Sequence, residues 1–278
     1  AKSPEARAAE EDFHAAFASA APLRALPTAL STSFVDVPGT GGVLTSGVQV
    51  STEALDYGPD SKQPATVDIL GLIWDDKGKR AGEFKTRLSV SPMSSAPSGG
   101  EQPGVIYNAR TPLTPGFYLV KVAARDARGR QTGSAAQWVE VPDLSKKQLA
   151  LSSIHIGGRA VGGGAGADAA AQQIQFSVDR RFSRSAKLDF LAFIYNARPS
   201  GTAVDLSANV RITRDGRAVV SAPPIKIAPP AQTDLARIPF TGVISLGQLP
   251  PGRYELELEV SDNSAKTSAA QRVAFDVQ

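Results

Sequence analysis

The stretch TPGFYLVKV at residues 114–122 decides the fold, because a near copy, PPGRYELEL, follows at residues 250–258. In each copy a proline and a glycine make a tight turn, and a tyrosine follows near the start of a strand. The tyrosine ring can fill a core while its hydroxyl bonds nearby backbone, as in a tyrosine corner. We therefore predict structural roles, and no catalytic ones, for six residues: Pro115, Gly116, Tyr118, Pro251, Gly252 and Tyr254.

The similarity extends beyond this stretch. It continues at the same offset through Asp126 and Asp262 to Val141 and Val277. A second pair of blocks, VDILGLIWD at residues 67–75 and LDFLAFIYN at residues 188–196, matches at a different offset. Two blocks in the same order predict two copies of one sandwich. In this interpretation the aromatic residues at the matched block ends, Trp74 and Tyr195, fill the cores.

Most of the chain alternates apolar and polar residues over short stretches that are separated by turn residues. The predicted strands are 30–37, 43–52, 66–74, 84–90, 105–110, 116–125 and 134–141, then 148–156, 172–178, 186–195, 207–214, 225–228, 236–244, 252–261 and 271–277. We predict an all-β protein with two tandem immunoglobulin- or fibronectin-III-like β-sandwiches. The first domain takes residues 28–143 and the second takes residues 144–278. A short N-terminal helical segment at residues 1–27 precedes them.

The N-terminal segment has a clear helix start at Ser3-Pro4-Glu5, and Pro22 ends the helical pattern. Phe13 and Phe17 are four residues apart and form an apolar stripe on one face. A helix this short is marginal alone, so the stripe must pack against the first domain or against another molecule. We therefore treat Phe13 and Phe17 as possible partner contacts.

Composition argues against several classes of function. The chain is 42% hydrophobic and 21% charged, as in globular proteins, and it has no cysteine. Disulfides, thiolate nucleophiles and cysteine-ligated metals are thereby excluded. With only two histidines, His14 and His155, most transition-metal sites and histidine catalysis are unsupported. We expect no catalytic, cofactor-binding or metal-binding residues. Calcium between the domains, at Asp126, Asp143 or Asp262, stays open.

Three further motifs receive plain structural interpretations. The glycine-rich stretch at residues 157–166 lacks a following Gly-Lys-Ser/Thr, so we predict a flexible loop rather than a phosphate site. His155 falls in a predicted strand without a Gly-x-Ser-x-Gly elbow, which leaves a hydrolase as a remote alternative. The basic cluster Arg180, Arg181, Phe182 and Arg184 fits a solvated turn better than a polyanion site. We expect no nucleic-acid binding.

The charge is divided unevenly along the chain. Residues 1–143 hold 14 Lys+Arg against 16 Asp+Glu, a net charge of −2, and residues 144–278 hold 16 against 11, a net charge of +5. This asymmetry would allow head-to-tail contact, although ordinary solvated surfaces explain it more simply. No apolar run approaches the ~20 residues of a membrane span. The chain begins at Ala1, so we expect a processed or trimmed product.

Several segments resemble a known bacterial family. They are QWVEVPDLS at residues 137–145, LALSS at residues 149–153, APLRALP at residues 21–27 and the two Pro-Gly-x-Tyr elements. Together these are similar to the region that follows the A domain in secreted von Willebrand factor type A domain-containing (VWFA-related) proteins. The resemblance covers nearly the whole chain and implies export to an extracytoplasmic location, in the periplasm, at the cell surface or outside the cell. The Asp-x-Ser-x-Ser metal motif of the A domain is missing, since the nearest string is DLSAN at residues 205–209. Metal-dependent adhesion is therefore not implied.

These observations favour a non-enzymatic, extracytoplasmic tandem module. We expect it to serve protein–protein interaction or structural assembly at a cell surface, in a filament or in a multisubunit complex, through a protein partner or self-association. The alternative is a carbohydrate- or polymer-binding accessory module, which would need exposed aromatic residues on a sheet face or loop.

Overall fold

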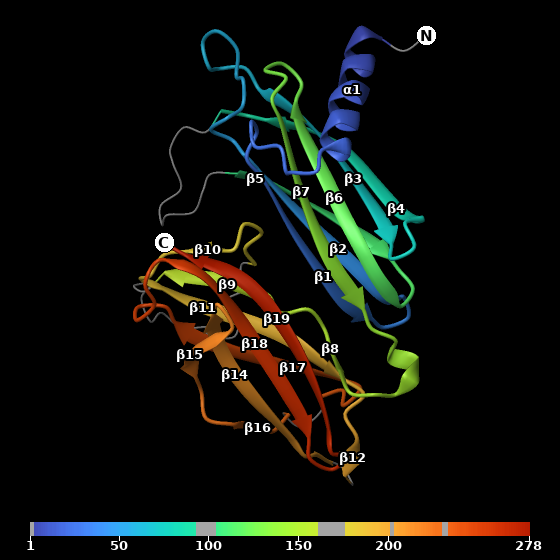
Figure 1. Cartoon of the computed structure of the whole chain (residues 1–278), viewed down its shortest axis with the longest axis vertical. Helices are drawn as coiled ribbons and strands as arrows, with labels where there is room; N and C mark the ends of the chain where they lie inside the picture. The colour runs from blue at the N-terminus through green and yellow to red at the C-terminus, as the bar shows by residue number, and fades with distance from the viewer. Residues whose placement is uncertain (1–2, 93–103, 161–175, 201–202, 230–232) are drawn as a thin grey trace. The chain divides into compact units, whose positions relative to one another are not determined.

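The computed structural model describes residues 3–92, 104–160, 176–200, 203–229 and 233–278. It divides into two compact units, Ala1–Val141 and Pro142–Gln278, and each is built mainly of antiparallel strands; the short strand pair Arg181–Phe182 and Asp276–Val277 in the second unit is parallel (Figure 1). The prediction of an all-β protein with one N-terminal helix is confirmed. The predicted strand at residues 172–178 lies largely outside the described residues.

Helix α1 spans Pro4–Ala18 and has the predicted start. The Ser3 hydroxyl accepts a hydrogen bond from the Ala6 amide at 3.2 Å, which satisfies one of the free donors of the first turn. Pro4 occupies the first turn, where its missing N–H costs nothing. The residues after α1 run on to β7, where Leu26 N donates to Thr132 O and Ser134 N donates to Leu23 O.

The first unit is a sandwich of three strands against four. One sheet has the order β1-β2-β5, from Thr28–Val37, Gly41–Ser51 and Gly104–Pro112. The other has the order β4-β3-β6-β7, from Arg80–Val90, Ala65–Asp75, Gly116–Asp126 and Thr132–Val141. Along β6, Tyr118, Val120, Val122 and Ala124 are buried in the core. Because successive side chains of a strand point to opposite faces, the odd-numbered residues of β6 lie on the outer face.

The second unit repeats this arrangement with more interruptions. The central strand β11 (Ala186–Tyr195) pairs with β17 (Arg237–Ser245) on one side. On the other side it pairs with β8 (Ala150–Leu151) and then with β9 (His155–Ala160). The opposite sheet has the order β10-β19-β18-β14-β15. Its strands are Arg181–Phe182, Thr267–Val277, Gly252–Asp262, Leu206–Arg214 and Arg217–Ser221.

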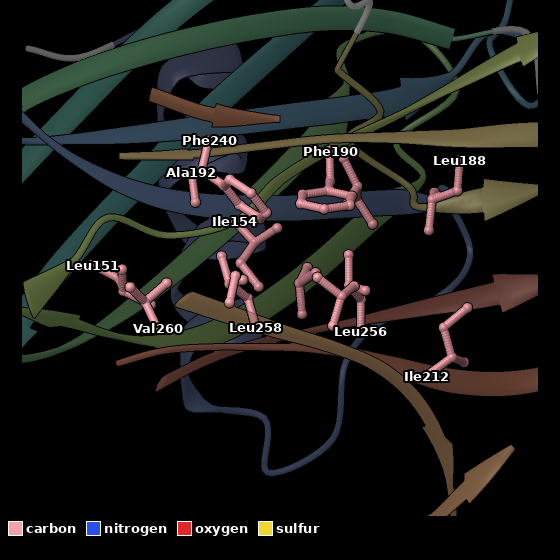
Figure 2. Close-up of a cluster of buried hydrophobic side chains, with 14 of the residues drawn as sticks. Leu151, Ile154, Leu188, Phe190, Ala192, Ile212, Phe240, Leu256, Leu258 and Val260 are labelled. Atoms are coloured by element: carbon pink, nitrogen blue, oxygen red, sulfur yellow. The ribbon is translucent and has the colours of Figure 1, made fainter. Parts of the chain in front are cut away.

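Smaller elements complete the second unit. Strand β16 (Ile225–Ile227) also pairs with β14, β12 (Pro199–Ser200) pairs with β13 (Ala203–Val204), and a 3-10 turn spans Leu144–Lys146. Between the two sheets lies one apolar core, in which Phe190 of β11 contacts Phe240 of β17 at a tilted angle and Leu256, Leu258 and Val260 project from β18 (Figure 2). Asp215 and Gly216 form the hairpin turn between β14 and β15, with φ of +51° and +74°.

Two sequence interpretations need correction. Strand β6 is equivalent to β18, because each pairs with the last strand of its unit, but β3 and β11 occupy different sheets. The partner of β18 that corresponds to β3 is β14, so the blocks at residues 67–75 and 188–196 are not copies of one strand. Buried central strands share an aliphatic pattern, and that pattern produced the match. Gly157 and Gly158 belong to β9 and not to a loop, and the predicted strand 148–156 is broken between β8 and β9.

Candidate functional site

The predicted structural tyrosines both bond back to the backbone. The Tyr118 hydroxyl donates to Thr114 O at 2.8 Å, and the Tyr254 hydroxyl donates to Pro250 O at 2.6 Å. Both rings are buried. The preceding glycines, Gly116 and Gly252, have φ of +157° and +150°, a region that favours glycine. These two turns fix the start of β6 and β18 in the same way.

Two buried aspartates end these strands and also have matching contacts. Asp126 accepts hydrogen bonds from the amides of Asp56 and Arg128, at 2.7 and 3.0 Å. Asp262 accepts them from the amides of Arg198 and Ala265, at 2.7 and 2.9 Å. Each carboxylate thus ties a loop and a turn to the end of its strand. The described residues contain no group of three or more His, Cys, Asp or Glu side chains arranged to hold a metal ion.

His155 and the basic cluster have structural surroundings. The His155 ring lies 4.9 Å from the Phe176 ring at a tilted angle, and burial, with the charge of Arg180, lowers the His155 pKa to about 4. Burial also lowers the pKa of Arg180. Phe182 packs on Phe275 inside the core, so the cluster at residues 180–184 is not one continuous surface. Asp143 caps the 3-10 turn, and its hydrogen bonds from Ser145 lower its pKa.

The face of the β4-β3-β6-β7 sheet that points away from the core, which we call the outer face, carries α1. Phe13 and Ala16 of α1 pack on Ala123 of β6 and are buried there, with Leu70 of β3 beside them. Phe13 is only 5% exposed, so the predicted partner contact through this residue is not available in the structure. Phe17 is half-buried and meets the Trp74 ring edge-on at 6.3 Å.

A buried ionic network fastens α1 to this face. Arg125, whose side chain is 2% exposed, donates to Asp12 of α1 at 2.6 Å and lies 3.7 Å from Asp68 of β3. Arg87 bridges Asp68, at 2.6 Å, and Glu5 of α1, at 3.1 Å. The hydrogen bond and charge of Asp68 raise the pKa of Arg87 above its ordinary value. Sequence reasoning missed this network, although a charged residue at position 68 inside an apolar strand was a signal for it.

Beyond the last turn of α1 the outer face continues with large apolar side chains. By strand register, Trp74 of β3, Leu119 of β6 and Trp138 of β7 lie side by side in one row. Phe117 precedes Leu119 on the same face of β6. Trp138 is 58% exposed and Phe117 is 51% exposed. We call these four residues the open half of the outer face. The prediction that Trp74 fills the sandwich core is wrong, because the residue lies on the outer face.

The matching face of the second unit is charged. The matched positions are Arg253 for Phe117, Glu255 for Leu119 and Ala274 for Trp138. Glu257, which corresponds to Lys121, pairs with Arg272 and Arg211 at 2.9 and 3.3 Å. The same strands thus form with charged, solvated outer positions. The fold does not require the apolar side chains of the open half.

A shallow pocket lies at the end of α1, and Ala136 of its lining stands two residues before Trp138 on β7. It has a volume of about 60 Å³ and is open to solvent, between the end of α1, the following segment and strands β6 and β7. Most of its lining residues are small, among them Ala16, Ala20 and Ala136. Lys121 is the one charged residue of the lining, and its Nζ lies 3.5 Å from Phe17 O. The arrangement offers an apolar recess beside an exposed aromatic surface, with one cation at the rim.

Comparison with known proteins finds only distant structural similarities. No protein-family model matches the chain, and no curated protein matches it significantly. Among solved structures, Bacteroides uniformis beta-glucuronidase is similar over 84% of this chain and 26% of its own, at 13% identity and a TM-score of 0.29. Escherichia coli alpha-2-macroglobulin activated by porcine elastase is similar over 91% of this chain and 22% of its own, at 16% identity and a TM-score of 0.25.

The BSP domain of a biofilm associated protein is similar over 97% of this chain and 55% of its own, at 8% identity and a TM-score of 0.28. The chain therefore spans about a quarter of the length of the first two structures. Among the residues that the structure describes, no helix is long and apolar enough to cross a membrane.

Proposed function

We propose that the protein is a non-enzymatic, extracytoplasmic module that binds another protein through the open half of the outer face of its first unit. One observation carries this proposal: the chain builds the same face twice, charged in the second unit and apolar in the first. Exposed apolar clusters on soluble proteins mark contact sites, and tryptophan and phenylalanine are enriched in the centres of protein interfaces. The extracytoplasmic location follows from the family resemblance given above.

The polar groups of the described residues support a binding role over catalysis. The buried carboxylates of Asp126 and Asp262 hold backbone amides, and Asp68 holds arginines. The two buried tyrosines hold turn carbonyls. Each of these groups has a structural partner that accounts for its position. The exposed aromatic side chains have no comparable structural role.

The experiment replaces residue 138 with a photo-reactive benzoyl-phenylalanine in cells that produce the protein. Illumination should give a covalent adduct of defined mass, and adding Phe117→Arg and Leu119→Glu should abolish it. The control places the same probe at position 274, the matched position of the second unit, where no adduct should form. Equal cross-linking at positions 138 and 274 would contradict the proposal, as would its absence at both.

Carbohydrate binding is the second candidate, and the exposed aromatic side chains of Trp138 and Phe117 on a flat sheet face favour it specifically. Affinity electrophoresis in gels that contain soluble polysaccharides separates the two candidates. If a polysaccharide slows the migration of the protein and Trp138→Ala abolishes this effect, a glycan ligand would be favoured over a protein partner. If no polysaccharide changes the mobility of the protein, the protein-binding proposal stands.

A further inference from the structure

We propose that the open half docks an amphipathic helix of a partner protein beside α1. In this arrangement the tip of an aromatic or leucine side chain of the partner helix enters the pocket beside Ala136, and a partner carboxylate meets Lys121. The inference rests on the proposed function and names the kind of partner that the same surface takes.

Continuity with the α1 interface is the first argument. The outer face already binds a helix, since Phe13 and Ala16 pack on Ala123 of β6. The open half is formed by further residues of β3, β6 and β7, so the same surface extends past the end of α1 without a break. The row from Trp74 to Trp138 crosses three strands, a width of about 10 Å, which is about the diameter of a helix with its side chains.

The pocket supplies the second argument. Small apolar residues and Phe17 make up much of its lining, so it suits the tip of an apolar side chain better than a sugar hydroxyl. Its volume of about 60 Å³, open to solvent, takes the tip of such a side chain rather than the whole of it. Exposed Trp138 stands on the same strand as Ala136, two residues along, and would cover the neighbouring turn of the docked helix. Such a recess beside an aromatic side chain is the usual place for an interface anchor.

Lys121 sets the charge of the partner. Its ammonium group reaches the carbonyl of Phe17 at the end of α1, at 3.5 Å, and three donors are available on that group. A second acceptor can therefore bind at the same nitrogen. Helix α1 shows the complementary pattern on its own polar edge, where Asp12 lies next to Phe13 and pairs with Arg125. We therefore expect an acidic residue beside the aromatic anchor of the partner helix.

The experiment uses the full chain and a helical probe with this pattern. The probe is an acetylated, amidated peptide of residues 3–19, SPEARAAEEDFHAAFAS, with Arg7→Lys and a lactam between positions 7 and 11 to hold it helical. Circular dichroism verifies its helicity first. The control peptide carries Phe13→Ser and Phe17→Ser. Binding is followed by tryptophan fluorescence, since the only two tryptophans of the chain, Trp74 and Trp138, lie on the open half.

The variants of the full chain come from its own second unit. Ala136→Arg and Lys121→Glu introduce the residues found at the matched positions 272 and 257. We expect saturable binding of the helical peptide to the wild-type chain. Each variant chain should bind this peptide at least tenfold more weakly, and the wild-type chain should bind the control peptide at least tenfold more weakly. The exposed Val243→Arg substitution in the second unit should leave binding unchanged.

Two results would overturn the inference. One is no binding of the verified helical peptide up to 1 mM. The other is binding that Ala136→Arg and Lys121→Glu leave unchanged, which would mean that the peptide takes the place of α1 or binds elsewhere. Either result combined with a cross-link at position 138 would refute the helical partner and leave the proposed function standing. Loss of the cross-link as well would refute both.

Discussion

Replacing Asp12 with asparagine should release helix α1 from the first unit while the sandwich stays folded. The Asp12 carboxylate accepts a 2.6 Å hydrogen bond from Arg125, whose side chain is almost fully buried. Removing the charge leaves Arg125 with Asp68, 3.7 Å away, as its remaining counter-ion. Burying a guanidinium whose charge is incompletely neutralised is unfavourable. Because undocking of α1 exposes Arg125 to water, the substitution favours the undocked state.

The size of the effect follows from two opposing terms. Breaking a buried pair by removing one partner costs about 3–5 kcal/mol, but asparagine keeps an acceptor and Asp68 remains, so we expect about 2–3 kcal/mol. The apolar burial of Phe13 and Ala16 holds α1 in place with roughly 3–4 kcal/mol, before the cost of ordering the helix. The loss therefore removes most of the docking energy. Because about 1.4 kcal/mol corresponds to a factor of ten in an equilibrium constant, the protection of the α1 amides against exchange should fall roughly 30- to 100-fold.

Hydrogen exchange with mass spectrometry measures this directly. Peptides within residues 4–18 should lose protection in Asp12→Asn, whereas peptides from β6 should change little. Glu11→Gln, on an exposed residue of the same helix, is the matched control and should leave both regions as in the wild type. Unchanged protection of residues 4–18 in Asp12→Asn, or an equal loss in both variants, would refute the role given to the ionic network.

Three further predictions concern the stability of each unit. Tyr118→Phe and Tyr254→Phe should each lower the unfolding free energy of its own unit by about 1–2 kcal/mol, since each removes a hydrogen bond to a turn carbonyl and a longer one with the side chain of Thr114 or Arg214, and urea unfolding with a fluorescence and a circular-dichroism probe should show the two transitions shifting separately. The His155 pKa is about 4 in the folded protein against 6.5 for the free side chain, so the unfolded state binds more protons between these values and the second unit should lose about 3 kcal/mol as the pH falls from 7 to 4; His155→Gln should flatten this dependence. Gly133→Ala should detach the segment before β1, because its new Cβ would lie 1.7 Å from Leu26 O, and limited proteolysis should then cut that segment, whereas Gly247→Ala, with only ordinary contacts at 3.8 Å and beyond, should stay resistant.

The strands were predictable because a half-buried antiparallel strand leaves a two-residue period in the sequence. The seven predicted strands of the first domain correspond in order to β1–β7, with ends that differ by a few residues. Alternation alone does not say which sheet a strand joins. That is why β3 and β11 could be aligned although they belong to different sheets.

The open half of the outer face was missed for a related reason. Aromatic residues were assigned to the cores, as is usual for large apolar side chains, and Trp74 was placed there too. Comparing the two copies gives a signal that neither copy gives alone. In residues 250–258, polar and apolar residues alternate strictly after the tyrosine, and the polar ones point outward. In the first copy the outward-pointing residues 117 and 119 are apolar instead. Apolar residues on both faces of a strand indicate that both faces are covered; here the core covers one side, α1 covers part of the other, and the proposed partner would cover the rest.

The measurement that tests the central claim most directly is the unfolding free energy of the triple variant Phe117→Arg, Leu119→Glu and Trp138→Ala. It gives the first unit the residues that the second unit carries at the same positions. If these side chains serve contact with a partner, urea unfolding should place the first unit within about 1 kcal/mol of the wild type, as expected for surface substitutions. A loss of about 4 kcal/mol or more would show that they hold the sandwich together, and the claim would fail.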